Sequence, residues 1–190
     1  MEPVRRDLPD DAGALHAGAV RVTTTDTART ARTARTSRLD AGVRSALQAV
    51  SAAAKQGFGD PALAELVQIR ASQLNHCAFC LDMHLEIARK HGVGQRQLDL
   101  LAAWEEAGDD VFDGRERAAL ELTEAVTVLT GGPSRAFGSG GGFVPDEVYA
   151  RAAAHFDADR LAHLLALITA INSWNRLMVA RRVPAGGSPW

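Results

Sequence analysis

Apolar residues recur every three or four positions through most of this chain, and that spacing limits what it can fold into. Such spacing places side chains on one face of an α-helix. From Asp40 onward, no stretch of the sequence alternates polar and apolar residues convincingly enough to predict a strand. The sequence therefore predicts an all-α fold of about six to eight helices. Apolar residues make up 46% of the 190 positions, which is enough for one core.

Capping signals and apolar stripes place the expected helices. Asp60 before Pro61 predicts a helix start, because aspartate caps an N-terminus and proline is tolerated in the first turn. Asp113 and Glu116 have the spacing of a capping box, and Pro145 opens a further helix. The apolar stripes predict four more helices, at about 43–54, from about 75, at about 98–108, and at about 159–178.

Three segments fall outside this helical pattern. Residues 1–37 are rich in Thr, Ala and Arg and have no apolar face, so they are expected to be a disordered tail. Residues 131–143 are expected to be a glycine-rich insertion, and 184–190 a C-terminal tail. The sequence thus predicts one domain over residues 38–183.

Net charge and hydropathy limit the classes of partner and the cellular location that we expect for this protein. The formal net charge is −2, without the basic excess that nucleic acid or an anionic membrane attracts, so neither partner is expected. No apolar stretch is long enough to span a bilayer, and the start Met1-Glu2-Pro3 lacks the basic residues of a signal peptide. We therefore expect a cytoplasmic location. In the cytoplasm, a lone cysteine pair is more often redox-active or metal-bound than a permanent structural disulfide.

The two cysteines of the chain lie three residues apart, at Cys77 and Cys80, and His84 follows four residues later. These steps put all three side chains on one helix face. Asn75 is expected to cap that helix, so Cys77 would lie in its first turn, where unpaired N–H groups and the helix dipole favour a thiolate. The imidazole of His84 could then move protons for sulfur chemistry.

Glu65 is a further candidate, from the preceding helix. If the chain folds back near Asn75, Glu65 lies ten residues before the turn and His84 nine after it, so the two come level. A carboxylate beside His84 would fix its tautomer and raise its basicity. The alternative is an ordinary solvated glutamate on a helix surface.

Zinc binding is an alternative use of the same residues. The cysteine pair and His84 could supply three ligands, with His76, His91 or Glu65 as the fourth. Structural zinc sites usually draw on two separated pairs of ligands, and the sequence has no second pair, which favours redox chemistry. A buried cysteine pair without chemistry is a third interpretation.

The sequence contains Glu65, then eleven further residues, then the string Cys77-x-x-Cys80-x-x-x-His84. This pattern resembles the signature of the alkylhydroperoxidase D-like group within the carboxymuconolactone decarboxylase family. Other segments resemble the same family: Arg38-Leu39-Asp40, Leu100-Leu101-Ala102-Ala103-Trp104 and Ala170-Ile171-Asn172-Ser173-Trp174-Asn175-Arg176. The resemblance extends from about residue 38 to residue 183.

The resemblance implies an all-α thiol peroxidase that needs no cofactor and works as a homo-oligomer, a trimer or a hexamer. It implies that Cys80 attacks a hydroperoxide or disulfide substrate, that Cys77 resolves the product, and that Glu65 and His84 relay protons. A dithiol or a thiol protein would then be the reductant. A lyase like the namesake decarboxylase is an alternative, although that chemistry needs no cysteine pair.

One position departs from the family pattern. The best-studied members carry a second histidine just before the attacking cysteine, and here that position is Phe79. Phenylalanine carries no protons, so the relay is expected to be shorter or to use water. Asn172 and Asn175, on the apolar side of the last helix, are expected to be architectural, because buried asparagines need hydrogen-bond partners.

Overall fold

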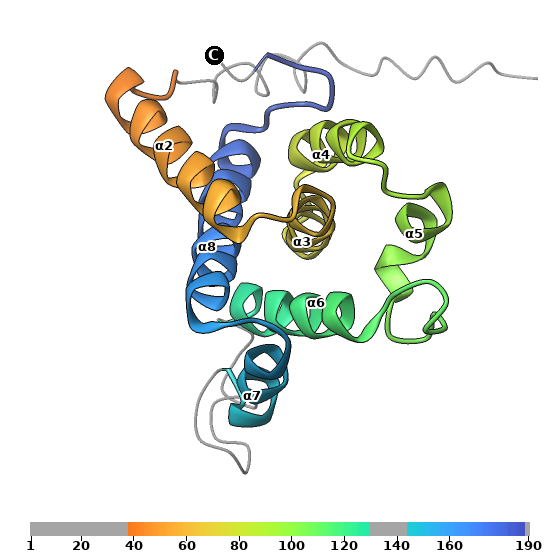
Figure 1. The fold of residues 1–190 in the computed structure, drawn as a ribbon. Coiled ribbons are helices and arrows are strands. Elements are labelled where there is room, and N and C mark those ends of the chain that lie inside the picture. Colours follow the sequence, from red (N-terminus) through yellow and green to blue (C-terminus); the bar gives the residue numbers. More distant parts are fainter. Residues whose placement is uncertain (1–37, 130–143, 189–190) are drawn as a thin grey trace, which may run out of the picture.

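The computed structural model describes residues 38–129 and 144–188 of the chain, and all regular structure within them is helical (Figure 1). The described residues contain no strand, so the all-α prediction is confirmed. The tail 1–37, the insertion 131–143 and residues 189–190 of the C-terminal tail lie outside the described residues. The helices are α2 Ala41–Phe58, α3 Pro61–Leu74, α4 Ala78–Lys90, α5 Gln95–Leu100, the short 3-10 helix η1 Leu101–Ala103, α6 Gly114–Thr127, α7 Asp146–His155 and α8 Ala158–Arg181.

Helix α3 is the centre of the fold, with α4, α6 and α8 arranged around it (Figure 1). Every residue from Leu63 to Ile69 is buried. A helix that is buried all round is expected to be apolar throughout. Glu65 and Gln68 nevertheless lie in this buried stretch, so both side chains need polar partners inside the protein.

The predicted helix caps are present. Asp60 accepts a hydrogen bond of 3.0 Å from the N–H of Leu63, with Pro61 in the first turn of α3. Asp113 and Glu116 form the expected capping box at the start of α6. A cap of this kind typically stabilises a helix by about 1 kcal/mol. The starts of these two helices were therefore predictable from local sequence.

The start of the cysteine helix differs from the prediction. Asn75 ends α3, where its N–H donates to the carbonyl of Ala71 at 3.0 Å, and it does not cap α4. His76 then takes a left-handed conformation with a φ of 54°, which turns the chain. Cys77 is therefore the N-cap of α4 and lies just before its first turn. The turn between the two helices uses two residues more than the sequence pattern indicated.

The helix expected at about 98–108 is also different. The chain forms the short helix α5, and η1 follows directly. Short 3-10 segments commonly tighten the end of an α-helix, and apolar spacing alone does not distinguish the two. Leu98, Leu101 and Trp104 are buried as their spacing suggested.

Helix α2 leaves much of its apolar stripe at the surface of the single chain. Val43 and Val50 are each 49% exposed, and Ala46 is exposed too. Only Ala54 and Phe58, near its C-terminal end, are buried. The stripe correctly predicted a helix, but most of it is not core.

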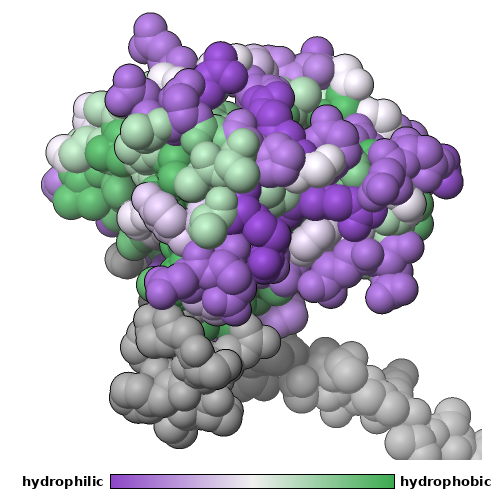
Figure 2. All heavy atoms as spheres, turned by 60° about the horizontal axis from the view of Figure 1, so that its bottom comes forward, coloured by the Kyte–Doolittle hydropathy of each residue, from purple (hydrophilic) through white to green (hydrophobic). Residues whose placement is uncertain are grey.

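Within the described residues, no helix is both long and apolar enough to cross a membrane. In the view of Figure 2, hydrophilic side chains cover much of the surface, and apolar side chains form separate areas between them.

Candidate active site

The two cysteines are joined by a disulfide at the start of α4, with their Cα atoms 5.4 Å apart. Cys77 is the N-cap residue, and its Sγ accepts a hydrogen bond of 3.3 Å from the N–H of Cys80. The relative exposures of Cys77 and Cys80 are only 2% and 1%. The prediction that the two sulfurs can reach each other is confirmed.

A small apolar cluster surrounds the disulfide, between the start of α4 and the C-terminal half of α8. Ala71, Ile171 and Met178 are its other fully buried members. This cluster is separate from the main core. Because buried apolar side chains on α3 and α8 surround the sulfurs, the position of the disulfide is set by tertiary packing as well as by the local helix start.

A buried carboxylate and imidazole lie beside the cysteines. Oε2 of Glu65 is 2.7 Å from Nδ1 of His84, and the two residues are 1% and 4% exposed. The prediction that antiparallel packing of these helices brings Glu65 level with His84 is confirmed. A carboxylate only accepts hydrogen bonds, so Nδ1 carries the hydrogen and Nε2 is left to exchange protons.

Lys55 is a third charged residue in contact with the Glu65–His84 pair, and the sequence patterns did not lead us to predict it. Its Nζ lies 2.6 Å from Oε1 of Glu65, and Nε2 of Gln68 donates to the same oxygen at 3.2 Å. A signal was present, because Lys55 and Glu65 are five residues before and after Asp60, at the turn between α2 and α3. Counting residues away from the turn near Asn75 placed Glu65 beside His84. The same counting away from Asp60 places Lys55 beside Glu65.

The surroundings of Glu65 control its charge. Burial raises the pKa of this carboxyl, but the hydrogen bonds and charges of His84 and Lys55 outweigh burial and hold the pKa below its usual 4.5. Glu65 is therefore ionised at neutral pH. The buried negative charge holds the hydrogen of His84 on Nδ1.

Cys80 and His84 line one pocket of about 450 Å³, which Lys55 also lines. The remaining wall is largely apolar and includes Phe79, Met83, Ile87, Ile171 and Trp174. Phe79, at the position where the sequence resemblance leads us to expect a histidine, thus contributes to the apolar wall. The pocket therefore offers a sulfur and an imidazole beside space for an apolar group.

The described part of the chain holds no group of three or more His, Cys, Asp or Glu side chains placed to bind a metal ion. The two sulfurs are bonded to each other, and Nδ1 of His84 is taken by Glu65. These contacts favour redox use of the cysteine pair over the zinc alternative.

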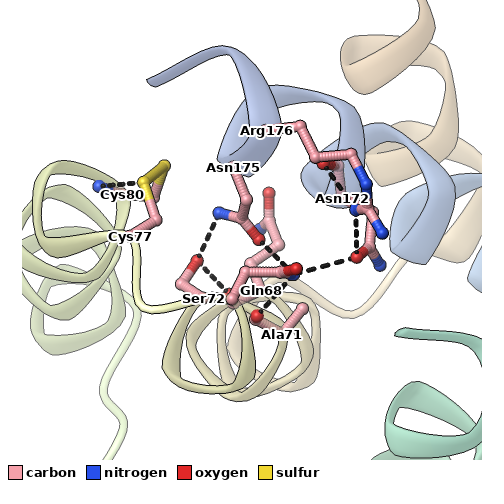
Figure 3. The surroundings of a disulfide bond; sticks show 9 residues. Gln68, Ala71, Ser72, Cys77, Cys80, Asn172, Asn175 and Arg176 are labelled. Carbon is pink, nitrogen blue, oxygen red and sulfur yellow. Dashed lines mark hydrogen bonds between the residues drawn. A yellow bond between two sulfur atoms is a disulfide. The ribbon is translucent and has the colours of Figure 1, made fainter. Parts of the chain in front are cut away.

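Hydrogen bonds between amide and hydroxyl side chains join α3 to α8 beside the disulfide (Figure 3). Asn175 is fully buried, and its Nδ2 donates to Oγ of Ser72 at 3.0 Å. Nδ2 of Asn75 donates to Oδ1 of Asn175 and of Asn172, and Asn172 donates to Thr127. The prediction that these asparagines need partners when buried is confirmed. Their contacts hold the end of α3, immediately before Cys77, against α8.

We expect Asn175→Ala to lower the free energy of unfolding by about 1–3 kcal/mol, because Ser72 and Asn75 each lose a buried partner. Ser173→Ala is the matched control, since among the described residues that hydroxyl bonds only to the carbonyl of Thr169, in its own helix. Urea unfolding of both variants measures the difference. Equal effects of the two substitutions would contradict a structural role for this network.

The fold and the site together place the chain among all-α proteins that carry a paired-cysteine site. Residues 41–125 match the model of the Carboxymuconolactone decarboxylase family. A solved structure from Agrobacterium tumefaciens is also similar, with a TM-score of 0.66 and 29% identity, over 75% of this chain and 90% of that one. That protein, ATU0492, is of unknown function and is described as a candidate antioxidant defence protein, AhpD.

Two further bacterial proteins are similar in sequence. YdfG of Bacillus subtilis strain 168 is 43% identical over 116 residues, which is 61% of this chain and 71% of YdfG. YnjA of Escherichia coli K12 is 35% identical over 129 residues, which is 67% of this chain and 63% of YnjA. Both are named as uncharacterized proteins. The chain belongs to the carboxymuconolactone decarboxylase family, in its alkylhydroperoxidase D-like group, as the cysteine motif predicted.

Proposed function

We propose that the protein is a thiol peroxidase that reduces hydroperoxides through the Cys77–Cys80 dithiol. One observation carries the proposal: Cys80 lines the same pocket as His84, and Glu65 holds His84 at 2.7 Å. A nucleophile, a proton carrier and an orienting carboxylate thus meet beside an open space. The antioxidant description of the Agrobacterium protein is in keeping with this chemistry.

The first step is attack by the Cys80 thiolate on the distal oxygen of a hydroperoxide. The new S–O bond forms as the O–O bond breaks, and the electron pair leaves on the alkoxide oxygen. His84 protonates that oxygen, so an alcohol is released and Cys80 becomes a sulfenic acid. Glu65 stabilises the imidazolium that precedes this proton transfer.

Cys77 then resolves the sulfenic acid. Its thiolate attacks Sγ of Cys80, the S–O bond breaks, and the oxygen leaves as water after taking up a proton. The product is the Cys77–Cys80 disulfide, the form that the structure describes. A dithiol or thiol protein returns two electrons and restores both thiols.

The pocket wall favours an organic hydroperoxide over hydrogen peroxide. Phe79, Ile87 and Trp174 offer apolar contact, and the indole Nε1 of Trp174 already donates to Ser51 at 3.0 Å. Lys55 and Gln68, which also line the pocket, already donate to Glu65. An alkyl or aryl group gains binding energy from burial there. Lys55, which also lines the pocket, helps to keep Glu65 ionised.

The proposal is tested by one turnover without a reductant. The fully reduced protein should lose two thiols for each equivalent of cumene hydroperoxide consumed, and the alcohol should form in the same amount. Thiol titration and chromatography measure the three quantities. Persistence of both the peroxide and the thiols would contradict a peroxidase. Turnover of a lactone acid by the double variant Cys77→Ser/Cys80→Ser would favour the lyase instead.

We also propose a homo-oligomer, a trimer or a hexamer, working in the cytoplasm without a cofactor. The exposed apolar residues of α2, Val43 and Val50, support a second copy of the chain as partner, since apolar helix faces are commonly covered in assemblies.

A further inference from the structure

Side chains from three helices form a continuous series of polar contacts behind the pocket of Cys80. Nζ of Lys55, on α2, lies 2.6 Å from Oε1 of Glu65, on α3. Oε2 of the same carboxylate lies 2.7 Å from Nδ1 of His84, on α4. Glu65 and His84 are buried, whereas the Lys55 side chain is 35% exposed. The charges of Lys55 and Glu65 cancel, so the three side chains have no net charge when His84 is neutral.

Few titratable groups face this site within the part of the chain that the structure describes. Those that line the pocket, or contact its lining, are Lys55, Glu65, Cys80 and His84. The residues that α8 contributes to the pocket carry no titratable group. Cys77 lines a separate pocket of about 510 Å³, with His76 and Arg182. The protons that matter for attack by Cys80 are therefore those on Cys80 and His84.

The number of these protons depends on the charge of Lys55. A buried site that carries a net charge is costly, because burial removes the water that stabilises ions. With Lys55 present, the site is neutral when Cys80 and His84 share one proton, either as thiol and imidazole or as thiolate and imidazolium.

Without Lys55, the charge of Glu65 would be balanced only by a second proton. That proton would go to His84 rather than to the carboxyl group, because imidazole is the stronger base. Cys80 and His84 would then both be protonated, and no base would remain beside the thiol to accept its proton.

We propose that Lys55 is a positioning residue for the relay, and that its charge limits Cys80 and His84 to one proton between them. This inference rests on the proposed function, because it explains how the attacking thiolate forms. The S–H bond breaks as Nε2 of His84 gains the proton, and the electron pair stays on sulfur. Burial raises the pKa of Glu65, but His84 and Lys55 lower it overall, so the carboxylate stays ionised at neutral pH as this count requires.

The first test measures the charge of His84 in the disulfide form, in which Cys80 carries no proton. We expect a neutral imidazole in the wild-type protein and an imidazolium in Lys55→Met. Nitrogen NMR of isotope-labelled imidazole at neutral pH distinguishes the two forms, and His84→Gln identifies the signals among the six histidines. Lys55→Arg keeps the positive charge, so its His84 should stay neutral.

The second test measures the reactivity of Cys80 in the fully reduced protein. Iodoacetamide alkylates thiolates with loss of iodide, and fragmentation in the mass spectrometer separates an adduct on Cys80 from one on Cys77. Lys55→Met should slow alkylation of Cys80 about tenfold at neutral pH, because less of the sulfur is thiolate. The difference should shrink as the pH rises and the extra proton is lost. Lys55→Arg should restore most of the wild-type rate.

Lys90→Met is the matched control. Lys90 contacts Glu86 at the same distance of 2.6 Å, but the two side chains are 68% and 69% exposed, so water screens the pair. This variant should change neither measurement.

An imidazolium at His84 in the wild-type disulfide form would overturn the proposal, even if Lys55→Met did not fold. A neutral imidazole or an undiminished alkylation rate in Lys55→Met would overturn it as well. Neither measurement uses peroxide, so a failed peroxidase and a wrong role for Lys55 give distinguishable results.

Discussion

The Cys80→Ser variant should consume cumene hydroperoxide at least about 10³-fold more slowly than the wild-type protein. The physical reason is that a serine hydroxyl is not ionised near neutral pH, whereas a thiolate at a helix start is a strong nucleophile toward oxygen. Peroxide consumption under a saturating dithiol measures the effect. Wild-type rates in this variant would show that Cys80 is not the attacking residue.

Cys77→Ser should behave differently, and it provides the matched comparison. Serine is a preferred N-cap, so its hydroxyl can accept the N–H of Cys80 that Cys77 accepts now. Helix α4 should therefore start as before. This variant should reduce one equivalent of peroxide and then stop as a sulfenic acid on Cys80, which dimedone labels. If Cys77→Ser lost the first turnover while Cys80→Ser kept it, the two roles would be reversed.

Glu65→Gln should have the second largest effect, a loss of about 10- to 100-fold in peroxide reduction. Glutamine keeps the shape of the side chain but removes the charge that orients and stabilises His84. It should also lower the free energy of unfolding by about 2 kcal/mol at pH 7, because the hydrogen bonds from Lys55 and Gln68 lose a charged acceptor.

The pH dependence of this loss follows from the lowered pKa of Glu65. A carboxyl whose pKa is lowered by folding stabilises the protein fully above its unfolded value, here 4.5, and this contribution disappears as the pH falls through the folded pKa. The stability difference between wild type and Glu65→Gln should therefore be constant near neutral pH and shrink below about 4.5. A difference that grew toward low pH would contradict the ionised, buried carboxylate.

Glu86→Gln is the control for this prediction. Lys90 contacts Glu86 at 2.6 Å, the distance between Lys55 and Glu65, but the Glu86 and Lys90 side chains are 69% and 68% exposed. Exposed pairs contribute little to stability because water screens them. This variant should leave the peroxide rate unchanged and shift stability by less than about 0.5 kcal/mol.

Local sequence was sufficient wherever the responsible contacts are local. Asp60 with Pro61 and Asp113 with Glu116 start helices through hydrogen bonds to residues three positions away, so their patterns are visible in the chain. The spacing of Cys77, Cys80 and His84 follows from one helix in the same way. Even so, the cap assigned to Asn75 was wrong, because the turn depends on the left-handed residue His76.

Contacts between helices could be predicted only where a short turn sets the register. Counting from the turn near Asn75 placed Glu65 beside His84, and an equivalent count from Asp60 would have revealed Lys55. The apolar stripe of α2 shows the limit of such patterns. Val43 and Val50 have helical spacing, but nothing in the sequence indicates whether a core covers them.

The sequence alone determined the helical class, the family resemblance and the pairing of Cys80 with His84. These could be predicted because periodicity and short spacings reflect contacts within one helix. Tertiary structure alone decided that Cys80 and Cys77 line different pockets and that Arg182, about a hundred residues away in sequence, lines the same pocket as Cys77. The physical reason is that these spaces form where α4 packs against α8. Packing between distant segments depends on the shapes of all the side chains involved, and no periodicity encodes it.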